Sequence, residues 1–422
     1  MLRLLLTKDN SFLFSSLLLY KLVVDYSYYF INQNINIGGL YSFNFDFSNY
    51  IIGWLLTIIT YCILLYKKKV AISFILFFIY YVYIIPNIVY FSLSNQEITF
   101  LLYIVFPYSI IVFSIKNSKL VFSLANKVKI NYIIYCSIFI AICVLINLVY
   151  KTDGNFIHDF DYLYAFRKDY SGTSFFKIFN YLELWTIKVL SLFLLSYSLM
   201  YNKKLLLLFS VFLILILFLF TGYKIIILSF ILVFYLFYLF KLKNRIHYLL
   251  ITLILLLVFL LFYTKYTNNI MPASILIRRF LFMPVILNYE YFNFFTKHEY
   301  VYWSNSILKY FFIFSYDKNI PSLIGTSLGF KDMYANTGFI AMGFAHAGPF
   351  GVFLYTMIAS MIFNVINLLI NDSRLIVQIS VVILPIYTLF ISSDLFTTLL
   401  SHGLFPAIIL LYLLNSVDNN NK

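Results

Sequence analysis

The chain is a succession of long apolar stretches separated by short polar and basic segments. The stretches are apolar on both faces and lack the alternation of a membrane β-strand. A bilayer core of about 30 Å needs about 20 apolar residues per helix, so the pattern predicts about twelve transmembrane helices. We therefore expect an all-α, polytopic integral membrane protein, with residues 1–422 forming a single transmembrane domain. The predicted spans are 11–31, 49–66, 70–91, 97–115, 131–150, 179–200, 205–220, 225–240, 246–264, 349–370, 375–395 and 404–416.

Basic residues predict the orientation of these spans. Short loops that carry Lys and Arg remain in the cytoplasm. A basic segment follows each even-numbered span along the chain, which predicts that both termini are cytoplasmic. These segments are 67–69, 116–129, 203–204, 241–245 and Arg374.

Two long segments fall on the opposite, outer side, at residues 151–178 and 265–348. Loops longer than about 15 residues are usually functional or disordered. The second segment is rich in Phe, Tyr, Leu and Ile, a composition that argues against disorder. We expect it to fold as short helices on the outer membrane surface and to carry the active site.

Composition supports the membrane interpretation and excludes several functions. Hydrophobic residues are 63% of the chain and charged residues 11%, whereas a soluble domain is about half apolar and a quarter charged. The net charge of +14 is spread over loops between spans, so nucleic acid is not an expected partner. The three cysteines fall inside predicted spans without metal or disulfide spacing. No Walker loop, clustered acidic motif or H-E-x-x-H is present, so we expect no metal, no cofactor and an already activated substrate.

Basic side chains in the outer segments are candidates for phosphate binding. Arg278 and Arg279 lie in an apolar run, where a guanidinium is costly unless it is paired, and guanidinium binds phosphate through two parallel hydrogen bonds. Lys224 is the charged residue of the turn Thr221-Gly222-Tyr223-Lys224 between two spans. Arg167, in the first long segment, is a further candidate for substrate binding. The alternative for these residues is anchoring to lipid headgroups.

His346 is the candidate general base. It lies in a Gly-rich segment just before Pro349, and proline suits the first position of a helix. A histidine at this position has the chemistry to accept a proton from a sugar hydroxyl, although packing or helix capping is the alternative. Glu183 and Asp394 are further acid–base candidates because they are charged groups within or beside spans.

Three segments resemble the bacterial O-antigen polymerases, the Wzy or oligosaccharide repeat-unit polymerase family. Residues 278–295, an arginine pair followed by aromatic residues, proline and a tyrosine-rich run ending in Phe-Phe, resemble the long periplasmic loop of that family. Residues 336–351 resemble its Gly-rich segment that enters a late membrane helix. The Thr221–Lys224 turn resembles a Thr-Gly-Ser-Arg turn of O-antigen polymerases and ligases, with lysine replacing arginine.

The resemblance implies a GT-C-like fold in the bacterial inner membrane and a glycosyltransferase active site that faces the periplasm. Such a polymerase transfers a glycan from undecaprenyl diphosphate to the non-reducing end of another lipid-linked repeat unit, in O-antigen or capsule biosynthesis. Membrane lipids and a chain-length regulator protein are further implied partners. In such an enzyme Arg278, Arg279 and Lys224 would bind the diphosphate and His346 would act as the base. The residues that would contact the rest of the substrate are Tyr289, Glu290, Tyr291, Asn336 and Arg167.

Two other functions remain open, and the sequence offers no support for a third class. An O-antigen ligase uses similar chemistry with a lipid A acceptor. A lipid-linked oligosaccharide flippase would have a similar number of spans, but it would not need a large aromatic outer segment. A transporter of ions or small solutes is favoured by paired broken helices, and the sequence shows no matched pair.

Overall fold

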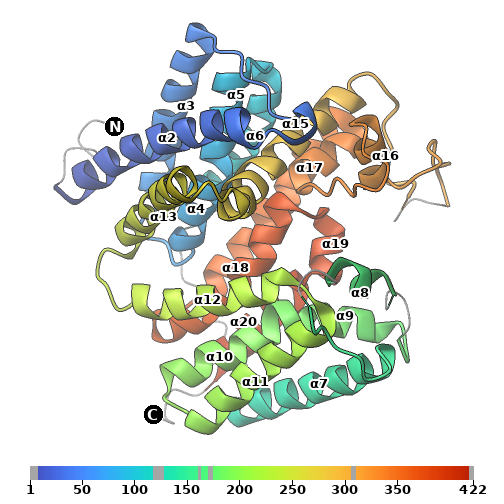
Figure 1. The fold of residues 1–422 in the computed structure, drawn as a ribbon. Coiled ribbons are helices and arrows are strands. Elements are labelled where there is room, and N and C mark those ends of the chain that lie inside the picture. The colour runs from blue at the N-terminus through green and yellow to red at the C-terminus, as the bar shows by residue number, and fades with distance from the viewer. Residues whose placement is uncertain (1–7, 117–127, 160–162, 170–173, 306–309, 418–422) are drawn as a thin grey trace. The chain divides into compact units, whose positions relative to one another are not determined.

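The all-α prediction is confirmed for the part of the chain that the structure describes. This computed structural model describes residues 8–116, 128–159, 163–169, 174–305 and 310–417. Helices connected by turns and coil make up these residues, and no strand occurs among them (Figure 1). Nine of the described helices are long and apolar enough to cross a membrane, as expected of a polytopic membrane protein. They are Phe47–Tyr66, Ser73–Ser94, Ile130–Lys151, Ile178–Met200, Lys204–Thr221, Arg245–Thr267, Met271–Phe295, Phe339–Leu369 and Asp372–Ile391.

The ends of most helices agree closely with the predicted spans. The predicted range 131–150, for example, is the helix Ile130–Lys151, and 205–220 is Lys204–Thr221. Shorter apolar helices at Ile98–Ser114, Lys224–Leu239 and Leu404–Ser416 occupy three further predicted ranges. Of the basic segment 116–129, residues 117–127 lie outside the described part of the chain.

The second long segment differs from the prediction of short surface helices. Its first part forms a helix of 25 residues, Met271–Phe295, which is long and apolar enough to span a bilayer. Arg278 and Arg279 lower the hydropathy of this stretch, and proline occurs near the start of two of its parts, which explains why the sequence suggested a loop. The later part includes a short helix, Ile320–Ser327, before a long helix that begins at Phe339 rather than at the expected residue 349.

The chain divides into two compact units. The first contains residues 1–117, 244–364 and 389–395, and the second contains the remainder. The helical elements wholly in the first unit are α2 (Lys8–Asn34), η1 (Ile37–Gly39), α3 (Phe47–Tyr66), α4 (Ser73–Ile79), η2 (Tyr80–Ile84), α5 (Ile85–Ser94), α6 (Ile98–Ser114), α13 (Arg245–Thr267), α14 (Met271–Ala273), η4 (Ser274–Phe282), α15 (Met283–Phe295) and α16 (Ile320–Ser327).

The elements wholly in the second unit are α7 (Ile130–Lys151), α8 (Leu163–Asp169), α9 (Ile178–Trp185), η3 (Thr186–Leu190), α10 (Ser191–Met200), α11 (Lys204–Thr221), α12 (Lys224–Leu239), η5 (Asp372–Arg374) and α20 (Leu404–Ser416). Three helices have residues in both units: α17 (Phe339–Leu369), α18 (Leu375–Ile391) and α19 (Leu395–Leu400).

The centre of the first unit is the continuous helix of α4, η2 and α5, whose apolar window is entirely buried. Asn288 of α15 joins this helix through a buried polar network. Its side-chain amide donates to Tyr83 Oη at 2.9 Å and to Asn87 Oδ1 at 3.3 Å, and its carbonyl accepts from Thr337 Oγ1 at 2.7 Å. Buried polar groups are costly unless they are bonded, so the network fixes α15 and residue 337 against the central helix.

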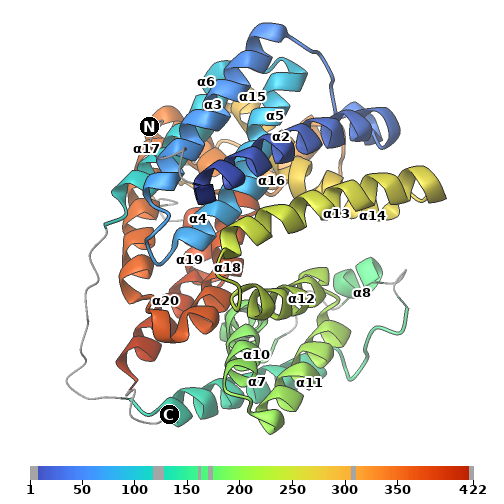
Figure 2. The same cartoon turned by 90° about the vertical axis from the view of Figure 1, so that its left-hand side faces the viewer.

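In the second unit, α10 packs against α11, α12 and α7, as Figures 1 and 2 both show. Arg374 is buried and donates a hydrogen bond to the Leu414 carbonyl near the end of α20. A cation at the C-terminal end of a helix is favourable because that end carries partial negative charge. This bond fixes α20 within the unit.

Candidate functional site

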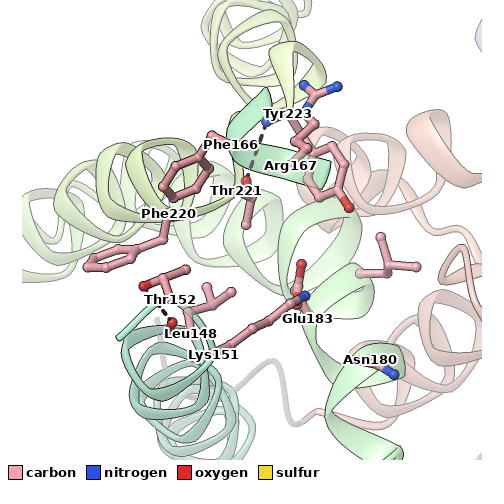
Figure 3. A pocket seen from close by; sticks show the side chains of 11 residues that line it. Leu148, Lys151, Thr152, Phe166, Arg167, Asn180, Glu183, Phe220, Thr221 and Tyr223 are labelled. Carbon is pink, nitrogen blue, oxygen red and sulfur yellow. Dashed lines mark hydrogen bonds and ion pairs between the residues drawn. The ribbon is translucent and has the colours of Figure 1, made fainter. Parts of the chain in front are cut away.

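A cavity of about 280 Å³ opens in the second unit where several helices end. It lies among the end of α7, the short helix α8, the beginning of α9 and the turn between α11 and α12 (Figure 3). The lining residues are Leu148, Lys151, Thr152, Phe166, Arg167, Asn180, Glu183, Leu184, Phe220, Thr221 and Tyr223. Apolar side chains form part of the wall, and charged and hydroxyl groups form the rest.

The turn beside this cavity follows from its sequence. Gly222 ends α11 with φ of 64°, a left-handed conformation that glycine adopts without strain. Its N–H donates to the Phe218 carbonyl at 2.8 Å, and the N–H of Tyr223 lies 3.4 Å from Thr221 Oγ1. The chain then enters α12 at Lys224, which is exposed and does not line the cavity.

The cavity holds two cations and one carboxylate. Lys151 Nζ lies 3.2 Å from Glu183 Oε2, and Figure 3 shows these side chains meeting. Arg167 donates to the Gly222 carbonyl and lies over the Tyr223 ring, 4.9 Å from its centroid. Burial and the nearby Glu183 raise the pKa of Tyr223, while Arg167 opposes this shift. At neutral pH, Tyr223 is therefore a neutral hydroxyl, and the three charges leave the cavity net positive.

A second group of functional side chains surrounds an interruption of α17 in the first unit. Ala347 and Gly348 have non-helical angles, and Pro349 starts the second half of the helix. Gly348 has φ of 56°, and a Cβ at this position would lie 2.6 Å from Tyr300 Oη. Glycine is thus required here, and the prediction that Pro349 begins a helix holds for this second half. His346 is the last residue before the interruption.

The surroundings of His346 determine which ring nitrogen carries hydrogen. Its Nδ1 accepts the backbone N–H of Trp303 at 3.3 Å, so the neutral ring carries its hydrogen on Nε2. This Nε2 lies 3.8 Å from Asp394 Oδ1. The Trp303 ring stacks on the imidazole at 5.0 Å, and its Nε1 donates to Tyr355 Oη at 2.8 Å.

This arrangement changes the expected role of His346. Its Nδ1 accepts a hydrogen bond, its Nε2 faces Asp394 beyond hydrogen-bond distance, and the residue is only 2% exposed, so burial leaves neither nitrogen open to a sugar hydroxyl. Asp394, in the interruption between α18 and α19, is the more accessible partner, with 15% of its side chain exposed. The two groups are thus close neighbours and form a candidate acid–base pair.

The two neighbouring arginines have different environments. Both belong to the π-helical stretch η4, an irregular helix type that is common at functional sites. Arg278 is buried and its Nε donates to Ser274 Oγ at 2.9 Å, whereas Arg279 is exposed. Burial raises the pKa of Tyr41 to about 12, and both arginines oppose that shift, so all three lie near one another. Arg279 is thus the member that can meet a ligand.

The predicted substrate-binding residues of the first unit have contrasting placements. Tyr289 and Tyr291 are fully buried, and Tyr291 donates to the Ala335 carbonyl at 2.8 Å. Neither ring has a face open to a sugar, so their placement gives the expected stacking role no support. Glu290 is half-buried and Asn336 is exposed. Arg167 and Lys224 belong to the second unit, and each group is described within its own unit.

Another buried cluster in the second unit was not anticipated from the sequence. Lys188, in the π-helical stretch η3, is 8% exposed and lies 2.9 Å from His402 Nδ1 and 3.3 Å from Thr388 Oγ1. The lysine can donate to both, which makes His402 neutral with its hydrogen on Nε2. Burial and Lys188 together lower the pKa of His402 to about 3. Lys188 and His402 each stand out in the sequence as ionisable residues within or beside a predicted span, but their contact depends on the fold.

Comparison with known proteins adds no assignment to these sites. No family model, no curated protein and no solved structure matches this chain.

Proposed function

We propose that this protein polymerises lipid-linked oligosaccharide repeat units by glycosyl transfer from undecaprenyl diphosphate. The observation that carries the proposal is the cavity of the second unit, where Arg167 and Lys151 lie beside the Thr221–Tyr223 turn. This is the turn that resembles those of O-antigen polymerases and ligases. A cavity of about 280 Å³ with net positive charge suits a diphosphate group at the end of a lipid.

In this reaction, an acceptor sugar hydroxyl attacks the anomeric carbon of the donor glycan. A new C–O bond forms, the bond from that carbon to the diphosphate oxygen breaks, and the diphosphate leaves on its lipid. Arg167 and Lys151 bind the donor diphosphate through charge-assisted hydrogen bonds, and the exposed Lys224 of the same unit is a further diphosphate ligand. Within the first unit, Asp394 is the proposed proton acceptor, His346 lies beside it, and the exposed Arg279 is a further candidate phosphate ligand. Because the donor is already activated, the reaction is metal-independent and uses no cofactor.

The proposal includes a topology of about twelve spans with a GT-C-like fold in a bacterial inner membrane. Both termini are then cytoplasmic and the site faces the periplasm, where a chain-length regulator is a candidate partner. In this topology both ends of the helix Met271–Phe295 lie on the same side of the membrane. One more crossing would place the C-terminus in the periplasm. Reporter fusions at residues 300 and 422 test this point. We expect periplasmic signal at the first and cytoplasmic signal at the second; cytoplasmic signal at residue 300 with periplasmic signal at residue 422 would mean that this helix crosses the membrane as a thirteenth span.

The decisive experiment uses purified protein and synthetic undecaprenyl-diphosphate-linked repeat units, with and without EDTA. We expect polymers with regularly increasing numbers of repeat units in both conditions. The absence of polymer under both conditions, and with added divalent cations, would contradict the proposal. Gene deletion separates polymerase from ligase, since polymerase loss leaves lipopolysaccharide with single repeat units and ligase loss leaves none.

A flippase for lipid-linked oligosaccharides is the second candidate, and the two helix interruptions of the first unit favour it. Residues 347–348 interrupt α17, and residues 392–394 separate α18 from α19. Interrupted helices form substrate sites in many transporters. Proteoliposomes that contain fluorescent lipid-linked single repeat units distinguish the two activities. Transfer of the lipid between leaflets without polymer formation would favour the flippase.

A further inference from the structure

Residues 310–313, which we call the apolar finger, expose apolar side chains outside the helices. Tyr310 is 85% exposed, Phe311 80%, Phe312 47% and Ile313 93%. Isolated exposed apolar residues are common on proteins, but adjacent ones form a surface that usually meets another molecule. The exposed side chains of Phe311 and Ile313 therefore favour an apolar surrounding.

Contacts with the end of α15 fix the position of the apolar finger. Tyr316, just beyond it, donates to the Glu299 carbonyl at 2.6 Å, and its ring lies perpendicular to Phe295 at 6.2 Å. Phe312 and Ile313 line the same open groove as Phe295, which is the last residue of the apolar helix Met271–Phe295. The finger thus lies at the level where an apolar helix ends.

That level is the boundary between hydrocarbon and headgroups. The hydrocarbon core of a bilayer is about 30 Å thick and the whole bilayer about 40–45 Å, so each headgroup layer is about 5–8 Å thick. Aromatic side chains are enriched in this layer because their rings suit an environment that is partly apolar and partly wet. The same level applies whether Met271–Phe295 crosses the membrane or returns to its starting side.

We propose that the apolar finger inserts into the headgroup layer of the bilayer and anchors the segment after α15 to the membrane surface. Three lysines, Lys297, Lys309 and Lys318, lie in this segment with two acidic residues, Glu299 and Asp317. The segment therefore carries a net charge of only +1, so apolar and aromatic side chains supply most of the attraction, and anionic lipids add a smaller contribution. The proposal is independent of the reaction that the protein catalyses.

The anchored finger also connects to the His346 cluster. The Phe312 ring stacks on Tyr302 at 5.9 Å. The Tyr302 N–H donates to the His346 carbonyl at 2.9 Å, and the next residue, Trp303, donates to the imidazole. Membrane insertion of the finger therefore holds the segment that packs on His346 in place.

Spin labelling of the full chain in lipid nanodiscs tests the proposal. Cys62, Cys136 and Cys143 are first replaced by alanine, and Ile313→Cys then carries a nitroxide. The matched control is Asp332→Cys, at an exposed charged residue outside the helices, and the lipid reference is Phe262→Cys, which is 70% exposed on α13. The ratio of relaxation by oxygen, which concentrates in lipid, to relaxation by a water-soluble nickel chelate is measured for each label.

We expect the ratio at residue 313 to exceed that at residue 332 several-fold and to remain below that at residue 262, in neutral as well as in anionic nanodiscs. A ratio at 313 equal to that at 332 would place the finger in water and overturn the proposal. A label at 313 that neither reagent reaches would indicate a protein contact and would also overturn it. If Ile313→Cys prevents folding, Phe311→Cys gives the same measurement at a neighbouring exposed position.

Discussion

The cavity of the second unit and the His346 cluster of the first unit hold their ionisable groups in different ways. Lys151, Arg167 and Glu183 lie where helices end and face an opening of about 280 Å³. His346 and Asp394 lie at interruptions within apolar helices, and stacking by Trp303 fixes the imidazole. A cation that meets a large mobile anion needs an accessible opening, whereas a proton-transfer group needs fixed geometry. The difference predicts that substitutions in the two regions affect different kinetic parameters.

The largest expected effect follows from Asp394→Asn, which keeps the shape of the side chain but removes its ability to accept a proton. We expect the turnover number with synthetic lipid-linked repeat units to fall about 10²–10⁴-fold, the usual contribution of a general base, with little change in KM. His346→Gln should reduce turnover less and displace the acidic limb of the pH–rate profile, since the residue acts through Asp394. Asp332→Asn is the matched control because Asp332 is exposed in the same unit. Full activity of Asp394→Asn would remove this residue from the mechanism.

Arg167→Ala is expected to have a smaller effect, and on KM rather than on the turnover number. The substitution removes a cation from the cavity, so the KM for the lipid diphosphate donor should rise about 10-fold, the effect of losing about 1.4 kcal/mol of a charge-assisted hydrogen bond. Inhibition by inorganic pyrophosphate should weaken in parallel. Lys177→Ala is the control, because Lys177 is an exposed cation close in sequence that does not line the cavity. An equal loss in both variants would show that general surface charge, rather than the cavity, attracts the donor.

The sequence predicts the helices better than the site, for a physical reason. A span is decided by the average of about 20 apolar residues, so the ends of α7 and α11 agree with prediction within one residue. The stretch Met271–Phe295 was not predicted as a span because Arg278 and Arg279 lower its average hydropathy, although the fold buries Arg278. Tyr289 and Tyr291 were predicted to stack on sugar rings, and only the packing of α15 against the central helix reveals that they are buried.

The elements of the His346 cluster were only partly visible in the sequence. His346 and Asp394 were each candidates, but pairing between residues so far apart along the chain depends on the fold. Trp303 carried no signal of its stacking role. In the second unit, Arg167 was predicted as a substrate ligand and does line the cavity, whereas Lys224 is exposed and does not line it. The sequence therefore identified candidate residues, and the tertiary packing determines which of them lie in a site.

The smallest expected effect concerns His402, a buried histidine whose charged neighbour is a lysine rather than a carboxylate. Burial, with a further contribution from Lys188, lowers its pKa to about 3, whereas an unfolded histidine has a pKa of about 6.5. Between these two values the unfolded chain binds a proton that the folded chain does not. The contribution of His402 to stability is therefore complete above about pH 6.5 and is lost progressively as the pH falls toward 3.

Thermal unfolding in detergent from pH 7 to pH 4.5 measures this contribution. His402→Gln should decrease the loss of Tm over this range by a few degrees relative to the wild type. Lys188→Met keeps the burial of His402 but removes the neighbouring charge, so its pH dependence should lie between the other two. Burial is the larger cause of the shift, which places Lys188→Met nearer to the wild type. Identical pH dependence of wild type and His402→Gln would mean that His402 takes up its proton without unfolding.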